Sequence, residues 1–291
     1  MAYGTFSSAI ANNYNKVNYT LNGKAYTGIS IFKTNPSTML VAPSCVASSQ
    51  KTGLENLCPN GIAASNVIAK TNATPMVYGG PGTDPFYGLF YTANGEVWFE
   101  GQKLSGPSAF PGTAYNFYPS LCLKTDGTAI IRWFLDNTQF IAAYPYCRSI
   151  IAGAHPLVYG GVSVFEATVY SQASDGGRRI ADWNDIDNKN YHFNNAICGS
   201  SAKSVTSRTF VGHKSDGSIY MVCLDTSGAY MDLQTGAKMM VDLGCDYAIN
   251  EDGGGAVKMR VAQNYSGSYA AGQMTVGGTS YYGSAICAYL K

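Results

Sequence analysis

The tetrapeptide Asp252-Gly253-Gly254-Gly255 is the stretch of this sequence whose residue types are best suited to chemistry. Three consecutive glycines remove every side chain from one stretch of backbone, so its N–H groups can converge on an anion such as a phosphate oxygen. A carboxylate beside that anion can act on a neighbouring carbon or proton. A glycine triplet after a strand is also typical of a turn or bulge, and Asp before Gly is typical of an Asx turn. The tetrapeptide alone leaves both interpretations open.

The thiols and imidazoles are scattered and form no recognisable catalytic or metal-binding pattern. No two cysteines have the C-x-x-C spacing of zinc and thioredoxin-like sites, and a catalytic Cys–His pair has no local support. We therefore expect no metal and no cofactor. A chain this long can build its own core, and no secretory signal is visible, so we predict mostly buried free thiols rather than disulfides. The residues concerned are Cys45, Cys58, Cys122, Cys147, Cys198, Cys223, Cys245, Cys287, His155, His192 and His213.

The composition indicates a folded chain with almost no excess charge. Of its 291 residues, 46% are apolar and 13% are charged, and 19 Lys and Arg stand against 18 Asp and Glu. A general nucleic-acid binder normally carries a basic surplus, so this class is excluded and any site for a charged ligand must be local. No apolar run reaches the roughly 18 residues of a membrane helix, which predicts a soluble protein without a membrane partner.

Four turn dipeptides, Asn-Gly or Asp-Gly, stand between residues of high strand propensity and predict antiparallel hairpins over 17–26, 89–99, 121–131 and 210–221. Apolar residues at helical spacing predict a helix over 230–243 that Gly244 can end. Residues 171–207 have little periodicity and predict a long loop excursion, which either covers a binding site or is a solvated insertion. The sequence thus predicts one α+β domain over 1–291, with a β-rich mixed sheet, several antiparallel hairpins and few helices.

Successive blocks of the sequence resemble the phosphodiester glycosidase family. The clearest are IAGAHPLV at 151–158, SRTFVG at 207–212, DLGC at 242–245 and YAINEDGGG at 247–255. Weaker matches are AKTNAT at 69–74 and the hairpin at 88–95. Two positions depart from the family pattern, because Glu251 replaces a usually apolar residue and Ala256 replaces a usual Ser. A changed substrate or a lost activity would follow from such departures.

The resemblance implies hydrolysis of a sugar-1-phosphodiester in a glycan or cell-surface polymer. Cleavage at C1 passes through an oxocarbenium-like state and expels a phosphate monoester, which is already a good leaving group. The site therefore needs a cation and backbone donors on the phosphate, and a carboxylate near C1. The resemblance gives these roles to Arg208, to the backbone of Gly253, Gly254 and Gly255, and to Asp252 as nucleophile or base.

Three further residues are expected at the same site. Asn72 would hold a sugar hydroxyl or the phosphate, His155 would donate to the phosphate, and Asp225 would orient Arg208. Structural roles compete with these assignments: a strand-end salt bridge for Arg208, and caps or turns for Asn72 and Asp225. Glu251 is left out, because consecutive strand residues point to opposite faces.

A second interpretation uses the same scaffold without catalysis. The chain would then be a glycan-binding or structural module of a larger assembly such as a phage particle, because one fold hosts many functions. Without a visible secretory signal, the cytoplasm and a phage particle both fit, and a homo-oligomer or virion assembly stays open.

Overall fold

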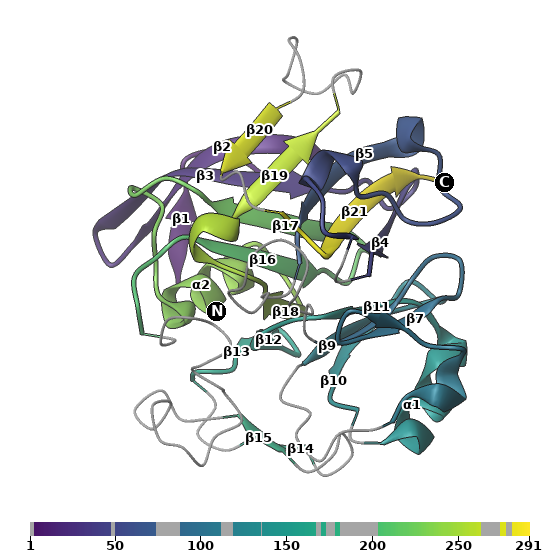
Figure 1. Cartoon of the computed structure of the whole chain (residues 1–291). Coiled ribbons are helices and arrows are strands. Elements are labelled where there is room, and N and C mark those ends of the chain that lie inside the picture. The colour runs from purple at the N-terminus through teal and green to yellow at the C-terminus, as the bar shows by residue number, and fades with distance from the viewer. Residues whose placement is uncertain are drawn as a thin grey trace.

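The structure is a computed structural model that describes residues 3–47, 50–73, 88–111, 119–134, 136–166, 170–172, 178–180, 203–262, 274–277 and 281–291. Strands dominate this part of the chain and only two α-helices accompany them, which confirms the predicted β-rich α+β class (Figure 1). The strand pairings in these residues are antiparallel.

The largest sheet has eight strands and carries Arg208 and His155, whereas Asp225 and Asp252 lie just beyond the ends of its strands. Its order is β1-β2-β3-β17-β16-β18-β12-β13, so strands from both ends of the chain meet at its centre. The strands are β1 (Gly4–Phe6), β2 (Asn13–Leu21), β3 (Lys24–Lys33), β12 (His155–Tyr159), β13 (Val162–Ser163), β16 (Arg208–His213), β17 (Ile219–Leu224) and β18 (Tyr247–Asn250).

Two further sheets pack around this one. The five-stranded sheet has the order β20-β19-β5-β21-β4, from β4 (Met39–Cys45), β5 (Val67–Asn72), β19 (Lys258–Val261), β20 (Met274–Gly277) and β21 (Ser284–Leu290). The six-stranded sheet has the order β10-β9-β11-β6-β7-β8, from β6 (Leu89–Tyr91), β7 (Val97–Phe99), β8 (Gln102–Lys103), β9 (Ser120–Lys124), β10 (Ala129–Arg132) and β11 (Cys147–Ala152).

All four predicted hairpins are confirmed, as β2–β3, β6–β7, β9–β10 and β16–β17. The turns differ in the backbone conformation of the Asn-Gly or Asp-Gly dipeptide. Asn22 and Gly23 both have positive φ, as a two-residue turn requires. In the longer turns Asp126 and Asp216 instead accept a hydrogen bond from the N–H two residues later, so only the following glycine needs positive φ.

The helix predicted over 230–243 is confirmed as α2 (Leu233–Asp242), which begins three residues later than expected. Asp232 accepts a hydrogen bond from the N–H of Thr235 and caps the helix, and Gly244 follows its end with a φ of 83°. The helix lies against β16, where Gly236 leaves room for the ring of Phe210. The sequence did not predict α1 (Asn137–Ala143), a short helix over the six-stranded sheet (Figure 1).

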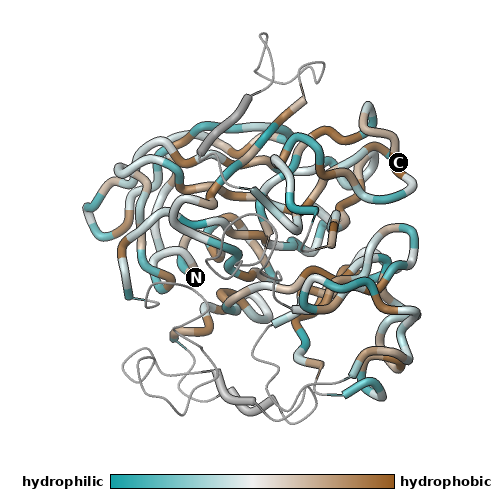
Figure 2. The backbone as a smooth tube through the Cα atoms, in the orientation of Figure 1, coloured by the Kyte–Doolittle hydropathy of each residue, from teal (hydrophilic) through white to brown (hydrophobic). Residues whose placement is uncertain are grey.

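One apolar core joins the three sheets, and a smaller one lies between the six-stranded sheet and α1. Figure 2 shows the apolar residues along the inner strands and hydrophilic residues at the outer turns. Single polar contacts also tie the sheets together: Ser149 Oγ donates to the carbonyl of Val41, and a ring nitrogen of His213 lies 2.9 Å from the carbonyl of Gly127. The strands of the site are therefore fixed from several sides.

Several sequence-based expectations concern regions that are described only in part. In the expected excursion at 171–207, strands β14 (Tyr170–Gln172) and β15 (Arg178–Ile180) form a small ribbon, and residues 181–202 lie outside the described residues. Seven of the cysteines are described as thiols, and Cys198 lies outside the description. Within the described chain, no helix has the length and apolar character needed to cross a membrane.

Candidate functional site

Three adjacent strands bring the predicted site residues together. Asn250 at the end of β18 pairs with Phe210 of β16 on one side and with His155 of β12 on the other. Residues paired across an antiparallel ladder share a face, and so do residues two apart on one strand. Arg208 therefore shares the face of His155 and Asn250, and the chain reaches Asp252 two residues beyond the end of β18.

Arg208 and His155 form the buried part of this site. Each side chain is 1% exposed, and Nη2 of Arg208 donates to the carbonyl of Ser204 at 3.0 Å. Burial, reinforced by the positive charge of Arg208, lowers the pKa of His155 to about 3. The imidazole is therefore neutral at physiological pH and offers a hydrogen-bond donor without adding a second charge.

The glycine loop lies directly beside the start of β16. The N–H of Gly254 donates to the carbonyl of Ser207 at 3.2 Å, and Oγ of Ser207 donates back to the carbonyl of Gly254 at 2.9 Å. The N–H of Gly253 donates to Oδ1 of Asp252 at 2.8 Å, a local bond of the Asx kind. Two of the three glycine N–H groups that we expected to face an anion are thus engaged within the protein.

The three glycines of the loop differ in their steric surroundings and backbone conformation. A Cβ at Gly253 would lie 2.7 Å from the carbonyl oxygen of Ser207 and 3.8 Å from Cδ of Arg208, so only glycine permits this close approach. Gly254 has a φ of +62°, in the left-handed region. A Cβ at Gly254 or Gly255 would meet nothing within 4 Å, and both residues are exposed. The open part of the site is therefore bare backbone.

Asn72 clamps the loop from the neighbouring sheet. Its Nδ2 donates to the carbonyl of Asp252 at 3.0 Å, and its Oδ1 accepts from Oγ1 of Thr209 at 2.7 Å and from the N–H of Lys258 at 3.0 Å. The side chain is 1% exposed. Asn72 therefore lies beside Asp252, and both the donor and the acceptor of its amide are engaged by the protein itself.

The carboxyl group of Glu251 has no hydrogen-bond partner among the described residues, although Glu251 is only 1% exposed. Its backbone N–H continues the ladder to Thr209, so its side chain shares the face of Thr209 and not that of Arg208. Burial first, and then the nearby Asp252, raise the pKa of Glu251 well above its usual range. The group is therefore a neutral acid, and it stands apart from Asp252 as the alternation predicts.

Asp225 lies one residue beyond the end of β17. Leu224 pairs with Arg208, so Asp225 follows the end of β17 opposite Ser207 and on the other face. Burial raises the pKa of Asp225, with a smaller lowering effect from Lys16. Among the described contacts, none joins Asp225 to Arg208, and its orienting role stays a prediction.

Sequence reasoning missed Ser207 and Thr209, which hold the loop and Asn72 on either side of Arg208. Both stand beside Arg208 in SRTFVG, and only that adjacency could have indicated them. No three His, Cys, Asp or Glu residues gather as a metal site in the parts of the chain that are described.

Known proteins resemble this chain in sequence and in fold. The family model of the phosphodiester glycosidases matches residues 65–281. No curated protein matches the sequence significantly. Among solved structures, the catalytic domain of zebrafish N-acetylglucosamine-1-phosphodiester alpha-N-acetylglucosaminidase, auto-inhibited by its pro-peptide, matches with a TM-score of 0.57 and 14% identity over 100% of this chain and 87% of that chain. A hypothetical protein from Synechocystis matches with a TM-score of 0.51 and 11% identity, over 99% and 68% of the two chains. At these identities the structural likeness shows the fold.

Replacing Asn72 should lower the free energy of unfolding. Asn72→Ala leaves the hydroxyl of Thr209, the N–H of Lys258 and the carbonyl of Asp252 without their partner, so we expect a loss of about 2–5 kcal/mol in the free energy of unfolding. Urea denaturation measures it. Asn66→Ala removes an exposed asparagine and should change stability by less than about 0.5 kcal/mol. An Asn72→Ala variant as stable as the unmodified protein would show that the clamp is unimportant for folding.

Glu251 should make stability depend on pH. Its pKa is raised in the folded state, so the unfolded chain releases the proton first and the folded state loses stability as pH rises above about 4.5. Glu251→Gln removes this titration. Between about pH 5 and pH 7 the variant should gain stability relative to the unmodified protein, by up to about 1.4 kcal/mol per pH unit. Denaturation curves at several pH values measure the difference, and a difference that does not vary with pH would contradict the burial of a neutral acid.

Proposed function

Since this chain belongs to the phosphodiester glycosidase family, we propose that it hydrolyses a sugar-1-phosphodiester bond in a glycan or cell-surface polymer. The observation that carries the proposal is the position of Arg208 beside the loop that begins with Asp252. A Cβ added to Gly253 would lie 3.8 Å from Cδ of Arg208, so the loop passes close to the Arg208 side chain. A cation and a carboxyl group thus meet at a segment with no side chains of its own.

The phosphate of the substrate would bind to the basic side of this arrangement. Arg208 offers a guanidinium fork that matches two phosphate oxygens, and the neutral His155 offers a further N–H. The open backbone of Gly254 and Gly255 lets a bulky sugar phosphate approach closely. Phosphate recognition would therefore rest on Arg208 and His155 more than on the glycine N–H groups.

Asp252 would supply the negative charge at C1. Its Oδ1 accepts the N–H of Gly253, which fixes the carboxylate relative to the loop. As the C1–O bond breaks, the bonding electrons leave with the phosphate monoester and C1 becomes oxocarbenium-like. Asp252 then either attacks C1 itself or takes a proton from the attacking water. Glu251, neutral and on the opposite face, would leave this role to Asp252.

A binding module without catalysis is the second candidate. The N–H groups of Gly253 and Gly254 are engaged in hydrogen bonds within the protein, and Arg208 is buried. Fewer hydrogen-bond donors are therefore available to a bound phosphate, which favours this candidate. Such a module would bind phosphorylated glycans without turnover, as a homo-oligomer or as part of a larger assembly such as a phage particle. Binding of a sugar-1-phosphodiester with no product release would favour this candidate.

Asp252→Asn tests the catalytic role. The amide keeps the size of the side chain and an oxygen for the N–H of Gly253, so the melting temperature should change little. Hydrolysis of an activated sugar-1-phosphodiester should fall on the order of a thousandfold, as for loss of a catalytic carboxylate. Release of the chromogenic leaving group measures the rate.

Two further variants sharpen the test. Arg208→Lys keeps the charge but loses the fork, so it should weaken phosphate recognition and raise KM. Asp216→Asn changes a carboxylate in the β16–β17 turn and serves as the matched control, with turnover retained. If Asp252→Asn hydrolyses the substrate as fast as the unmodified protein, Asp252 is not the catalytic carboxylate.

A further inference from the structure

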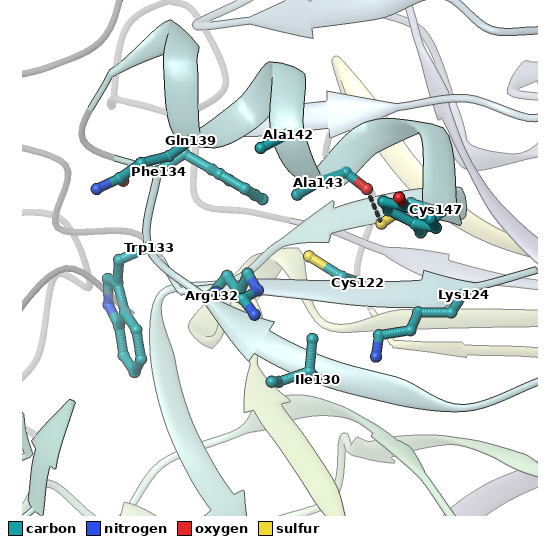
Figure 3. Close-up of a pocket in the computed structure, with 11 residues that line it drawn as sticks. Cys122, Lys124, Ile130, Arg132, Trp133, Phe134, Gln139, Ala142, Ala143 and Cys147 are labelled. Atoms are coloured by element: carbon teal, nitrogen blue, oxygen red, sulfur yellow. Dashed lines mark hydrogen bonds between the residues drawn. The ribbon is translucent and has the colours of Figure 1, made fainter. Parts of the chain in front are cut away.

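A cavity of about 350 Å³ lies under α1, on the face of the six-stranded sheet that is turned away from the main core. Side chains alternate along β10, so Ile131 enters the main core whereas Ile130 and Arg132 line the cavity. The candidate site described above belongs to a different sheet. Figure 3 shows the cavity walls. They are Cys122, Lys124, Ile130, Arg132, Trp133, Phe134, Gln139, Ala142, Ala143, Tyr146 and Cys147.

The walls combine two cations with a largely apolar and aromatic surface. Lys124 and Arg132 come from the neighbouring strands β9 and β10, and Figure 3 shows both cations on the sheet side of the cavity, below α1. None of the described lining residues is acidic. Phe134 follows β10 and provides flat apolar surface, whereas the Trp133 ring packs in the main core. A cavity of this size with a few charged groups on apolar walls is typical of a small-molecule site.

Two thiols, Cys122 and Cys147, also line the cavity. Sγ of Cys147 donates to the carbonyl of Ala143 at 3.4 Å. A hydrogen bond from Cys122 lowers the pKa of the Cys147 thiol, burial opposes this shift, and the charges of Lys124 and Arg132 lower it further. The pKa of Cys147 thus lies below its usual value although the thiol is buried, and the two cations contribute to that shift after the hydrogen bond with Cys122.

We propose that this cavity binds a small organic anion with a flat aromatic body. The anionic group would contact Lys124 and Arg132, and the ring would pack against Ile130 and Phe134. Arg132 gives the site its preference for a planar carboxylate or sulfonate, because its guanidinium can bond two oxygens at once. The site is separate from the proposed phosphodiester chemistry and does not depend on it.

Calorimetric titration with 2-naphthoate and with its uncharged amide, 2-naphthamide, tests the proposal. We expect 2-naphthoate to bind one-to-one and 2-naphthamide to bind at least about tenfold more weakly, because the amide loses the charge-assisted bonds. Arg132→Gln should weaken naphthoate binding by roughly the same factor. Lys24→Gln changes a lysine of the β2–β3 hairpin and should leave binding unchanged.

Two variants keep the test decisive if Arg132→Gln folds poorly. Ala142→Leu places a larger side chain from an exposed helix position into the cavity, so it should weaken both probes without changing charge. Asp252→Asn should bind naphthoate as the unmodified protein does, because its site lies elsewhere. Equal affinity for the two probes, no binding of either, or unchanged naphthoate binding by Ala142→Leu would overturn the proposal.

Discussion

The amide of Asn72 is the contact on which the candidate site depends. It lies in β5 of the five-stranded sheet, yet it bonds to Thr209 in the eight-stranded sheet and to the main chain on both sides of the glycine loop. A buried amide with its donor and its acceptor engaged specifies one relative position of the two sheets, because any displacement would leave polar atoms without partners. The loop carrying Asp252 is therefore held by the sheets and not by its own sequence, which is mostly glycine.

The charges around this clamp are arranged at a cost to stability. Arg208 is buried, and burial together with the charge of Arg208 keeps His155 neutral. Glu251 is buried as a neutral acid, with no hydrogen-bond partner among the described residues. Burying such groups is unfavourable and is tolerated in a large core. Proteins keep groups of this kind most often where function needs them. Three buried polar groups therefore gather where β12, β18 and β16 meet, and this gathering supports the proposed site at this end of the sheet.

The sequence predicted the parts of the fold that depend on neighbouring residues. The four hairpins follow from their turn dipeptides, and α2 follows from its apolar spacing and from Gly244. Helix α1 was missed because it has barely two turns and its apolar contact, Phe140, is a single residue. For the site, the family resemblance brought Arg208, His155 and Asp252 to one region. It could not show that the Asn72 amide bonds to the protein, nor that Asp225 lies opposite Ser207, because these facts depend on partners far away in the chain.

The place of β5 in its sheet has a consequence for how the protein folds. β5 lies between β19 and β21, whose residues come about 190 and 215 positions later in the chain. During synthesis β5, which carries Asn72, is made about 190 residues before β19 and still longer before β21. Until then it has neither of its neighbours in the sheet. Closing such large loops is slow because it costs conformational entropy, and a strand without its neighbours is prone to aggregate. The geometry of the candidate site thus forms late in folding, and the yield of native protein should depend on how well the unpaired β5 segment is kept from aggregating.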